Sequence, residues 1–485
     1  MSVTDRIAKT DILARASSGS ASIHESEVVT IRGLQTILCL FQFLRDPLAC
    51  AQDFFKRHGR LVVIEPVGAL PRRVTIVAVG GTYNRAILGN SQVWNMVRHV
   101  QSGPSGSALD RMGGNVLSMN GAPHDHYRKL IARPISSTSV TDMGDDIAQL
   151  VADEVARWPL GQVDLWQLVQ ELVRPVAIAL LFGGDQARGA QLAALLDDML
   201  LLNSTAQARL CPFDLRGLAY ARVLKQAEAV ERCAHELAQR KRGSMDQRDL
   251  LSLIVNSPDA TGNAPTADDV AGHLPILFGS TYETCQTVLL WSLFLLAQHP
   301  DVARDLVDEL AGARAGTPAT LARVSNLPLL DAVVKESMRL LPGVPYQVRV
   351  ATQPTRLGNY DVAPGSHALL SSFLTNRDPQ IYDEPARFRP GRWSRIDPTP
   401  FDYLAFSGGP RTCPGSWFGT AVVKVALATI LSRFRVGIVP DTRIDYQVAM
   451  TMKPRAGLAA TLHPPDGKWA AVPVKGRIRD IVDFS

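Results

Sequence analysis

The sequence feature that most constrains this fold is a ten-residue stretch near the C-terminus, FSGGPRTCPG, which runs from Phe406 to Gly415. Two glycines and a proline precede its single cysteine, Cys413, so we expect a loop there rather than a helix or strand. A thiolate is a soft ligand for iron when it stays deprotonated. A loop with free backbone N–H groups, followed by a helix N-terminus, favours that state. The plainer interpretation is an ordinary buried cysteine in a Gly/Pro loop.

Length and composition exclude several classes of protein. The chain has 485 residues, of which 46% are hydrophobic and 20% are charged, so a large core is available. The net charge of +5 is small for this length and does not indicate a nucleic-acid-binding surface. The six cysteines are scattered without C-x-x-C spacing. No zinc site or disulfide framework is therefore indicated, and a reducing cytoplasm is favoured.

The N-terminal part contains no segment that we expect to cross a membrane. The first residues, MSVTDRIAKTDILARASSGSAS, carry charges throughout and lack the apolar core of a signal peptide. The most apolar early stretch, Leu34 to Leu44, is too short to span a bilayer and contains Gln35 and Gln42. We therefore expect a cytoplasmic protein without a transmembrane anchor. A weakly membrane-associated apolar patch at this stretch is the alternative.

The pattern along the chain predicts a mainly α protein with small β-sheets, in the α+β class. A helix over 46–58 is followed by a strand pair at 61–65 and 74–79, and short strands recur after Pro342 around an irregular stretch at 376–412. Pro275 is expected to kink or interrupt the longest helix. We expect a single domain, 26–464, between a polar tail, 1–25, and a C-terminal extension, 465–485. The other predicted helices cover 147–158, 164–182, 186–202, 219–242, 266–298 and 415–433.

Five positions of the cysteine stretch carry a resemblance to a known family. Phe406, Gly409, Arg411, Cys413 and Gly415 fit F-x-x-G-x-R-x-C-x-G, the pattern of the cytochrome P450 family. A chance match in a chain of this length has a probability of roughly one in ten thousand. The resemblance implies a triangular helical prism around haem b, with the Cys413 thiolate as the axial iron ligand. Phe406 would then cover the sulfur, Gly415 would let the backbone pass under the haem, and Arg411 would reach a propionate.

A second motif resembles the family's structural charge cluster. Glu336 and Arg339 lie three residues apart on a predicted helix, with Asn326 as a plausible N-cap. The segment FRPGRW contributes Arg392, although Gly391 replaces the glutamate that is usual in the family. The resemblance implies that Glu336, Arg339 and Arg392 support the haem loop and are not catalytic. Unrelated surface ion pairs are the alternative interpretation.

The longest predicted helix contains STYETC, with an acid and an alcohol side by side at Glu283 and Thr284. A carboxylate is costly to bury unless it relays protons or has a partner, and a threonine can bond back to a carbonyl one turn earlier. The family places such a pair beside bound oxygen, which implies a catalytic role for both residues. Ser280, Thr281 and Cys285 depart from the family's usual residues here. The alternative is a mid-helix threonine beside a solvated glutamate.

An upstream segment, NGAPHDHYRKL, places His124 and Arg128 four residues apart on one helix face after a proline. The resemblance implies that these two side chains bind the haem propionates, and Arg349 falls where another propionate partner occurs. A solvated helix face is the alternative for His124.

The resemblance covers residues of about 46–463 and implies a haem-thiolate monooxygenase. It would insert one atom of O2 into an apolar steroid, terpenoid, fatty acid or similar molecule, with electrons from a ferredoxin or flavodoxin and its reductase. We expect a monomer, on which Lys129, Arg133 and Lys424 would help the electron donor to dock. The substrate would be lined by 94–117, 196–216, 277–284 and 342–347.

Two other functions remain open from the sequence. A peroxide-driven haem-thiolate peroxygenase would need no electron donor, although the retained Glu283–Thr284 pair argues against it. A non-catalytic haem sensor or carrier of hydrophobic ligands belongs to a different class, and no attached signalling or DNA-binding segment favours it.

Overall fold

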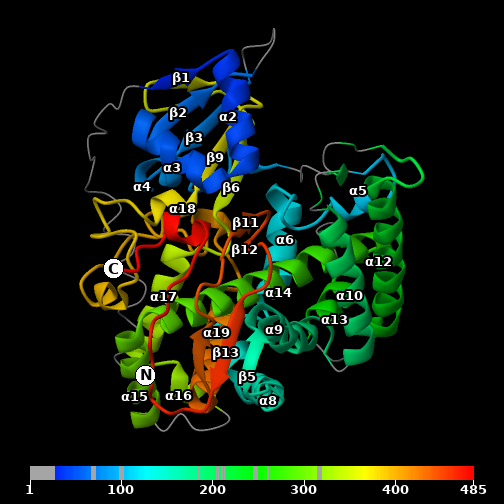
Figure 1. Ribbon diagram of the computed structural model, residues 1–485. Coiled ribbons are helices and arrows are strands. Elements are labelled where there is room, and N and C mark those ends of the chain that lie inside the picture. The colour runs from blue at the N-terminus through cyan, green and yellow to red at the C-terminus, as the bar shows by residue number, and fades with distance from the viewer. Residues whose placement is uncertain are drawn as a thin grey trace, which may run out of the picture.

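The protein has a sheet-rich end and a larger helical part, at the top and bottom of Figure 1. The computed structural model describes residues 28–66, 73–97, 103–183, 185–203, 205, 207–208, 211, 213–243, 249–258, 262–313 and 319–485. The predicted polar tail and parts of the predicted substrate-lining segments 94–117 and 196–216 lie outside the described residues.

Helices account for most of the described chain, as predicted. They are α2 (Leu34–Arg45), α3 (Pro47–His58), α4 (Gly81–Leu88), α5 (Ala108–Met112), α6 (Gly121–Ala132), α7 (Ser137–Asp142), α8 (Gly144–Val155), α9 (Leu165–Phe182), α10 (Gln186–Asn203), α12 (Ala219–Lys241), α13 (Leu250–Asn256), α14 (Ala267–Gln298), α15 (Pro300–Gly312), α16 (Leu321–Val324), α17 (Pro328–Leu340), α18 (Ser372–Thr375) and α19 (Ser416–Arg433). Three short 3₁₀ turns are η2 (Pro390–Ser394), η3 (Gly409–Arg411) and η4 (Arg477–Asp480).

The strands form one larger sheet and three small ones. The six-stranded sheet has the order β1-β2-β3-β9-β6-β4, and the others are β10-β13-β5, β11-β12 and β7-β8. The parallel pairing of β3 with β9 joins the predicted N-terminal strand pair to the strands that follow residue 342. The strands are β1 (Val29–Ile31), β2 (Leu61–Ile64), β3 (Thr75–Ala78), β4 (Trp94–Met96), β5 (Gly161–Asp164), β6 (Tyr346–Ala351), β7 (Thr355–Leu357), β8 (Tyr360–Val362), β9 (His367–Ser371), β10 (Arg435–Ile438), β11 (Tyr446–Val448), β12 (Met452–Pro454) and β13 (Ala459–His463).

The long helix α14 forms the centre of the helical part. A capping box begins it, because Thr266 accepts from the Asp269 N–H while the Asp269 carboxylate accepts from the backbone of Thr266. The helix continues through Pro275 for 32 residues, so this proline does not interrupt it, and the alternative of a kink stays a prediction. Trp291 and Phe294 are fully buried in the main core. The helix packs against α9, α12, α17 and α19, so residues along its length reach several parts of the molecule.

Local sequence explains the starts of several helices, such as α3, but the predicted start of α17 differs from the observed one. Asp46 accepts a hydrogen bond from the Ala49 N–H at the start of α3, where Pro47 is the first helical residue. The expected N-cap at Asn326 is wrong, because α17 begins at Pro328 and Leu327 holds the cap position. A proline suits the first helical position because it has no N–H to satisfy, and it decides the start here.

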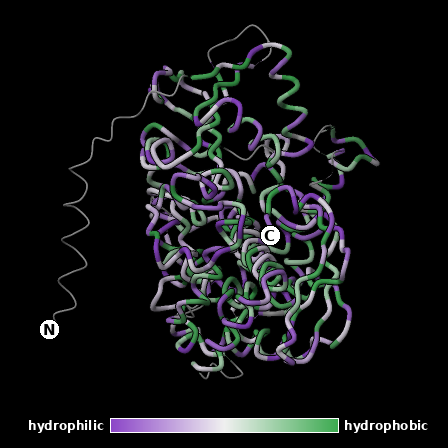
Figure 2. The backbone as a smooth tube through the Cα atoms, turned by 60° about the vertical axis from the view of Figure 1, so that its left-hand side comes forward, coloured by the Kyte–Doolittle hydropathy of each residue, from purple (hydrophilic) through white to green (hydrophobic). Residues whose placement is uncertain are grey.

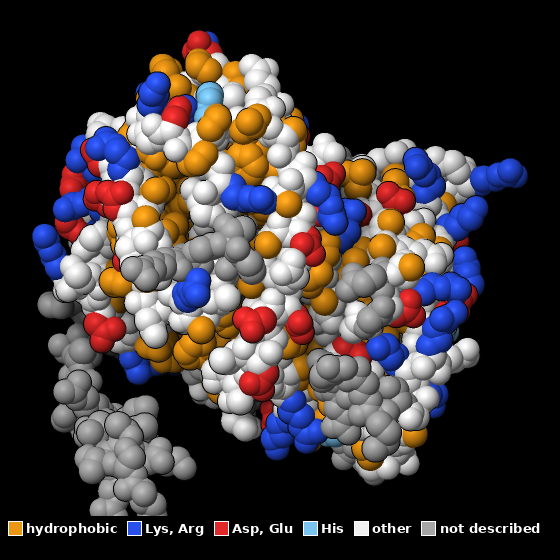
Figure 3. Space-filling view, turned by 90° about the horizontal axis from the view of Figure 1, so that it is seen from below, with side chains coloured by type: hydrophobic (Ala, Val, Ile, Leu, Met, Phe, Trp, Pro, Cys, Tyr) orange, Lys and Arg blue, Asp and Glu red, His pale blue; other side chains and the backbone are white. Residues whose placement is uncertain are grey.

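Apolar surface is unevenly distributed over the molecule. Runs of hydrophobic residues follow the sheet-rich end at the top of Figure 2, and Lys/Arg and Asp/Glu side chains are interspersed on the face in Figure 3. The described residues contain one helix long and apolar enough to cross a membrane, α9, which packs against α8, α10 and α14. Helix α2 carries the apolar stretch noted above, and its Leu34, Leu38 and Phe41 are 78%, 63% and 73% exposed.

The C-terminal segment 465–485 packs onto the body of the protein. Ile478, Ile481 and Val482 are buried in the main core. The buried guanidinium of Arg377 donates to the Ile481 carbonyl at 3.1 Å, which fixes the segment beside the end of α17. The division into a tail, one domain and an extension stays a prediction.

Candidate active site

The cysteine stretch forms the predicted loop, which includes the short turn η3 and ends where α19 begins. The Cys413 N–H donates to the Phe406 carbonyl at 2.8 Å, which closes the loop on itself. Arg128 of α6 donates to the Thr412 carbonyl at 2.5 Å. The loop is therefore held both internally and by a helix that lies far away in the sequence.

Gly409 is the position where this loop requires glycine. Its φ is +67°, in the left-handed region, and a Cβ there would lie 2.3 Å from the Leu88 carbonyl oxygen. Any side chain would therefore force the loop away from the end of α4. At Gly415, by contrast, a Cβ would make only ordinary contacts, 3.8 Å from the Cys413 Sγ and 3.9 Å from Ile135. Its expected role beneath a cofactor stays a prediction.

Protein atoms surround much of the Cys413 thiol, but the side chain is accessible to solvent. Burial raises its pKa, while the Gly415 N–H and the positive charge of Arg128 act in the opposite direction. The side chain is nevertheless exposed. The sulfur is therefore accessible to a bound group although protein atoms surround much of it. Phe406 is partly buried and packs against the main core.

Three arginines and one histidine gather near this loop without a matching set of carboxylates. Burial, and then the charge of Arg411, lowers the pKa of Arg349 to about 10. Within the described residues its guanidinium donates to the Val348 carbonyl at 2.9 Å and to the Gln347 side-chain oxygen at 3.4 Å. Burial and then Arg128 lower the pKa of Arg411. Burial is also the largest cause of the lowered pKa of His124.

These cations form a site that suits an anion. Arg411 donates to Asn120 Oδ1 at 2.8 Å. His124 lies 3.0 Å from the exposed carboxylate of Asp125, which is the one carboxylate recorded in contact with the four side chains in the described part of the chain. Buried cations that repel one another are costly unless an anion is bound between them. An accessible thiol beside such a cluster fits haem, which combines an iron atom with two anionic propionates.

The long helix α14 presents an accessible polar stripe in the middle of an otherwise buried segment. Ser280, Thr281 and Thr284 are partly accessible, whereas the neighbouring Gly279, Tyr282 and Cys285 are buried. The Thr284 hydroxyl donates to the Ser280 carbonyl at 2.6 Å, as the sequence suggested. Residues 280 and 284 share a helix face, so this stripe presents hydroxyl groups to the space beside the helix.

Ser280, Thr281 and Cys285, which differ from the residues that are usual in the family pattern, lie on two sides of α14. The first two lie on the accessible stripe and therefore add hydroxyl groups to it. Cys285 is buried on the side of α19, where its sulfur lies 3.6 Å from the position of a Cβ on Gly419. Burial raises the pKa of Cys285 to about 12, and Cys413 adds to the shift.

Glu283 is buried but its partners come from outside its own helix. Thr451 donates to its Oε2 at 3.2 Å, and the Lys453 Nζ lies 3.8 Å from its Oε1. Successive residues on a helix point about 100° apart, so Glu283 and Thr284 leave α14 in different directions. The sequence missed Thr451 and Lys453, because a separation of 168 residues leaves no local signal.

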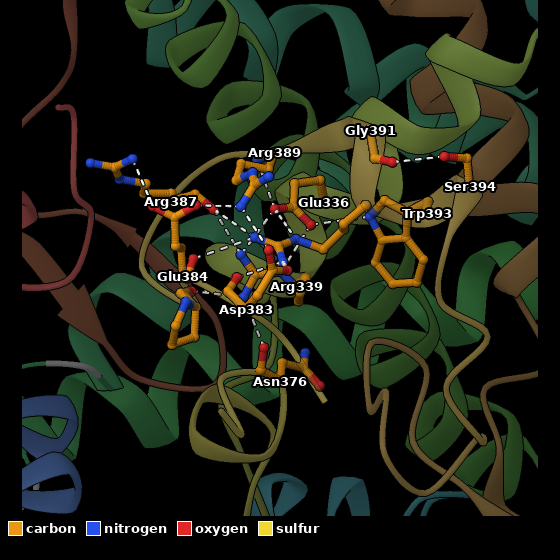
Figure 4. Close-up of polar contacts among 12 residues, drawn as sticks. Glu336, Arg339, Asn376, Asp383, Glu384, Arg387, Arg389, Gly391, Trp393 and Ser394 are labelled. Atoms are coloured by element: carbon orange, nitrogen blue, oxygen red, sulfur yellow. Dashed lines mark hydrogen bonds and ion pairs between the residues drawn. The ribbon is translucent and has the colours of Figure 1, made fainter. Parts of the chain in front are cut away.

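The predicted charge cluster forms around Glu336 at the C-terminal half of α17 (Figure 4). Arg339 binds the carboxylate through two nitrogens, at 2.9 and 3.0 Å, and Arg392 Nε binds it at 2.9 Å. The Trp393 indole donates at 3.1 Å and the Arg389 N–H at 2.8 Å. The carboxylate and both guanidinium groups are almost completely buried.

Gly391 stands where the family pattern usually has a glutamate, and the cluster forms without that side chain. Gly391 is exposed, and a Cβ there would meet no atom within 4 Å. Asp383, which the sequence did not indicate, binds Arg392 Nη1 at 2.6 Å instead. The expected docking role of Lys424 is wrong, because that side chain is buried and paired with Asp331 at 2.7 Å. Lys129 and Arg133 are exposed.

Comparison with known proteins gives consistent matches. The family model described as cytochrome P450 matches residues 39–459. The mouse protein cytochrome P450 4V2 is 33% identical over 192 residues, which are 38% of this chain and 36% of that protein. Putative cytochrome P450 135B1 of Mycobacterium bovis is 25% identical over 408 residues, 82% of this chain and 83% of that protein. The match to the mouse protein thus spans about a third of its length.

The fold also matches solved structures. The structure of cyanobacterial CYP120A1 with bound retinoic acid has a TM-score of 0.74 at 19% identity, and the match covers 87% of this chain and 96% of that chain. At that identity the likeness establishes the fold alone.

Proposed function

The chain belongs to the cytochrome P450 family, and we propose that it is a haem-thiolate monooxygenase that oxidises an apolar organic molecule. The family holds haem through a cysteine thiolate, which gives the enzyme class. The observation that carries the proposal for this chain is the accessible Cys413 thiol, which lies inside the protein beside a cluster of cations that lacks matching carboxylates.

The residues around Cys413 suit the haem in complementary ways. Cys413 would hold the haem iron through its thiolate, and the Gly415 N–H and Arg128 would favour the negative charge of that sulfur. Arg349, Arg411, Arg128 and His124 would hold the propionates, which relieves the cost of burying unpaired cations. Glu336, Arg339 and Arg392 act at a distance by fixing the segment before the loop. When bound, the haem activates O2 with two electrons and transfers one oxygen atom to the substrate.

The chain's own part in that chemistry is to deliver protons and exclude bulk water. The Thr284 hydroxyl, already bonded to the Ser280 carbonyl, accepts a hydrogen bond from a water or ligand in the space beside α14. Glu283 is the acid that passes protons from the surface to the Thr284 hydroxyl. The substrate lies against the accessible stripe of α14 and the segment 342–347.

The remaining assignments are finer parts of the same proposal. We place the protein in the cytoplasm as a monomer that takes electrons from a ferredoxin or flavodoxin and its reductase. Lys129 and Arg133 are exposed near the cysteine loop side of α6, so they can attract an acidic electron donor.

A spectral titration of the purified ferric protein tests the proposal. Steroids, terpenoids, fatty acids and aromatic compounds are added in turn, and the iron spin state is followed. A shift toward high spin with one class supports a free apolar substrate and names its class. No shift with any compound, although haem is bound, would contradict a free small-molecule substrate.

The variant Thr284→Ala separates the monooxygenase from the peroxide-driven alternative. With an electron donor, the monooxygenase should release hydrogen peroxide instead of product when this hydroxyl is missing. A peroxygenase would lose little activity, because peroxide arrives already reduced.

A further inference from the structure

A cluster of side chains that are able to bind a metal ion lies where α12 meets the start of α14, beside α5 (Figure 1). Glu231 and His235 belong to α12, and Asp268 belongs to the first turn of α14. One ligand atom from each of these three side chains lies within 4.8 Å of the other two. Among the described residues, this is the one group of three or more acidic, histidine or cysteine side chains that are close enough to share a metal ion.

Helix geometry places two of these side chains together, and tertiary packing adds the third. Glu231 and His235 are four residues apart, so they share one face of α12. The capping box at Thr266 fixes the first turn of α14, which carries Asp268 and packs against α12. The sequence alone shows the pair on α12 but gives no signal for the third ligand.

The distance between His235 and Asp268 suits a shared metal ion. The His235 Nε2 lies 3.3 Å from the Asp268 Oδ1. This nitrogen is buried, yet it makes no hydrogen bond within the described residues. Two atoms that bind zinc at about 2.0–2.1 Å in a tetrahedral site are about 3.3 Å apart, and the ion lies off the line that joins them. A close pair of ligand atoms without a hydrogen bond between them fits that arrangement.

Glu231 is able to join these two ligands while it stays bonded to Arg111 of α5. The Arg111 Nε and Nη2 donate to the two Glu231 oxygens at 2.7 and 2.6 Å. An ionised carboxylate has about four lone-pair sites, so two of them remain free for a metal ion. The guanidinium therefore orients the carboxylate without using all of its capacity.

Arg111 is also the positive charge that opposes a metal ion at this place. Its Nε lies 3.8 Å from the Asp268 Oδ2, so the guanidinium faces both carboxylates. A divalent ion between Glu231 and Asp268 would be repelled by this charge. The arginine should therefore lower the affinity of the cluster for any cation.

We propose that Glu231, His235 and Asp268 form a Zn²⁺ site that links α12 to the first turn of α14, and that Arg111 limits the affinity of this site. One imidazole and two carboxylates suit Zn²⁺, whereas Mg²⁺ and Ca²⁺ prefer oxygen ligands alone. The inference goes beyond the proposed function, because none of these four side chains takes part in the site around Cys413.

Isothermal titration calorimetry of the haem-loaded full chain with Zn²⁺ tests the ligands. The wild type should bind one Zn²⁺ per chain, and His235→Gln and Asp268→Asn should each bind it more weakly by a factor of more than about ten. The two side chains are 29% and 57% exposed, so both variants should fold. The exposed His367 of β9 provides the matched control His367→Gln, which should bind Zn²⁺ as the wild type does.

The variant Arg111→Gln tests the role of the guanidinium in the same titration. It should bind Zn²⁺ about ten times more tightly than the wild type, because one repelling charge is removed. Weaker binding in Arg111→Gln would show that the arginine serves mainly to orient Glu231, and the proposed limit on affinity would be wrong.

X-ray absorption at the zinc edge identifies the ligand atoms in the same protein. The proposal predicts nitrogen and oxygen neighbours at about 2.0–2.2 Å. A sulfur neighbour at about 2.3 Å would place the ion on a cysteine, such as the exposed Cys211, and would contradict the site. The proposal is also overturned if the wild type shows no saturable binding, or if His235→Gln binds Zn²⁺ as tightly as the wild type.

The two proposals fail in different ways. A protein that binds Zn²⁺ as described but oxidises none of the compounds tested contradicts the monooxygenase alone. A working monooxygenase without saturable Zn²⁺ binding contradicts the metal site alone.

Discussion

Two buried glutamates, Glu336 and Glu283, have opposite surroundings. The Glu336 carboxylate accepts five hydrogen bonds, from Arg339 twice and from Arg389, Arg392 and Trp393. Glu283 accepts one hydrogen bond, from Thr451, and its cation Lys453 is 3.8 Å away and partly exposed. Both are almost fully buried, so burial alone does not distinguish their functions.

The difference lies in how firmly each carboxylate is held in place. A carboxylate that is saturated by charged and polar donors cannot take up a proton without losing several bonds at once. A carboxylate with one hydrogen bond and a distant cation at the solvent boundary loses little. We therefore propose that the Glu336 region is a fixed support of the cysteine loop and that Glu283, which is held less firmly, is the catalytic acid.

The largest expected effect comes from removing the Glu336 charge. Glu336→Gln leaves the buried Arg339 without a carboxylate and Arg392 with Asp383 alone, which should lower the free energy of unfolding by about 3–5 kcal/mol. Glu283→Gln, as the matched variant, should cost no more than about 1 kcal/mol. Urea denaturation of both haem-loaded variants measures the difference, and equal costs would remove the distinction between the two regions.

The second effect is a loss of folding stability at acid pH that depends on His273 of α14. His273 is fully buried, it accepts from the Val116 N–H at 3.1 Å, and Tyr127 packs against it with ring centroids 4.0 Å apart. Burial lowers its pKa from 6.5 to about 4, against the opposing charge of Asp269. The unfolded chain therefore takes up this proton first as the pH falls, so stability that is complete above pH 6.5 is lost progressively down to about pH 4.

This single group should contribute up to about 3 kcal/mol of that loss. The free energy of unfolding of His273→Asn should fall less steeply than that of the wild type over the same pH window. Urea titrations at several pH values provide the measurement. A wild-type slope in His273→Asn would show that the acid-sensitive contact lies elsewhere.

The third effect compares two glycines in the region around the cysteine loop. Gly409→Ala should cost about 1–3 kcal/mol from the left-handed backbone alone, and the close approach to the Leu88 carbonyl adds to it. Gly391→Ala should change stability by less than about 0.5 kcal/mol, because the position is exposed and open. Thermal unfolding of the two variants distinguishes them, and a tolerated alanine at 409 would contradict the described loop.

Local sequence predicted one of the two glutamate regions much better than the other. The Glu336–Arg339 pair lies within one helical turn, and FRPGRW supplied Arg392, so the cluster could be anticipated from motifs. Asp383 and Trp393 as partners could not, since they depend on how an irregular stretch folds back on α17. The partners of Glu283 were missed completely, because only the tertiary contact of the β11–β12 turn with α14 brings them near.

Strong local patterns predicted the long helices, whereas single residues were predicted less well. Hydrophobic periodicity placed the long helices α9, α10, α12 and α14 to within a few residues. The predicted N-cap at Asn326 is wrong because α17 begins at Pro328. The predicted docking role of Lys424 is wrong because its ammonium group pairs with Asp331 inside the protein. A charge in a sequence does not reveal whether it is solvated.

The smallest expected effect concerns Arg349, the counterpart of Arg339 among the buried arginines. Arg339 has a carboxylate in contact, whereas the recorded contacts of Arg349 in the described chain are with neutral oxygens. Arg349→Met should therefore leave the stability of the haem-free protein unchanged or slightly higher. Its haem dissociation rate should rise about tenfold, since a charge-assisted hydrogen bond worth about 1.5 kcal/mol is lost. Transfer of haem to an acceptor protein measures the rate, and unchanged haem retention would contradict a propionate site.

The most direct test of the whole account is the carbon monoxide difference spectrum of the reduced protein in three forms. The wild type and Cys285→Ser should both give the red-shifted band of a haem held by a thiolate. Cys413→His should still bind haem but give the band of a histidine-ligated haem. A thiolate band that persists in Cys413→His, or that disappears in Cys285→Ser, would contradict the assignment of Cys413 as the iron ligand.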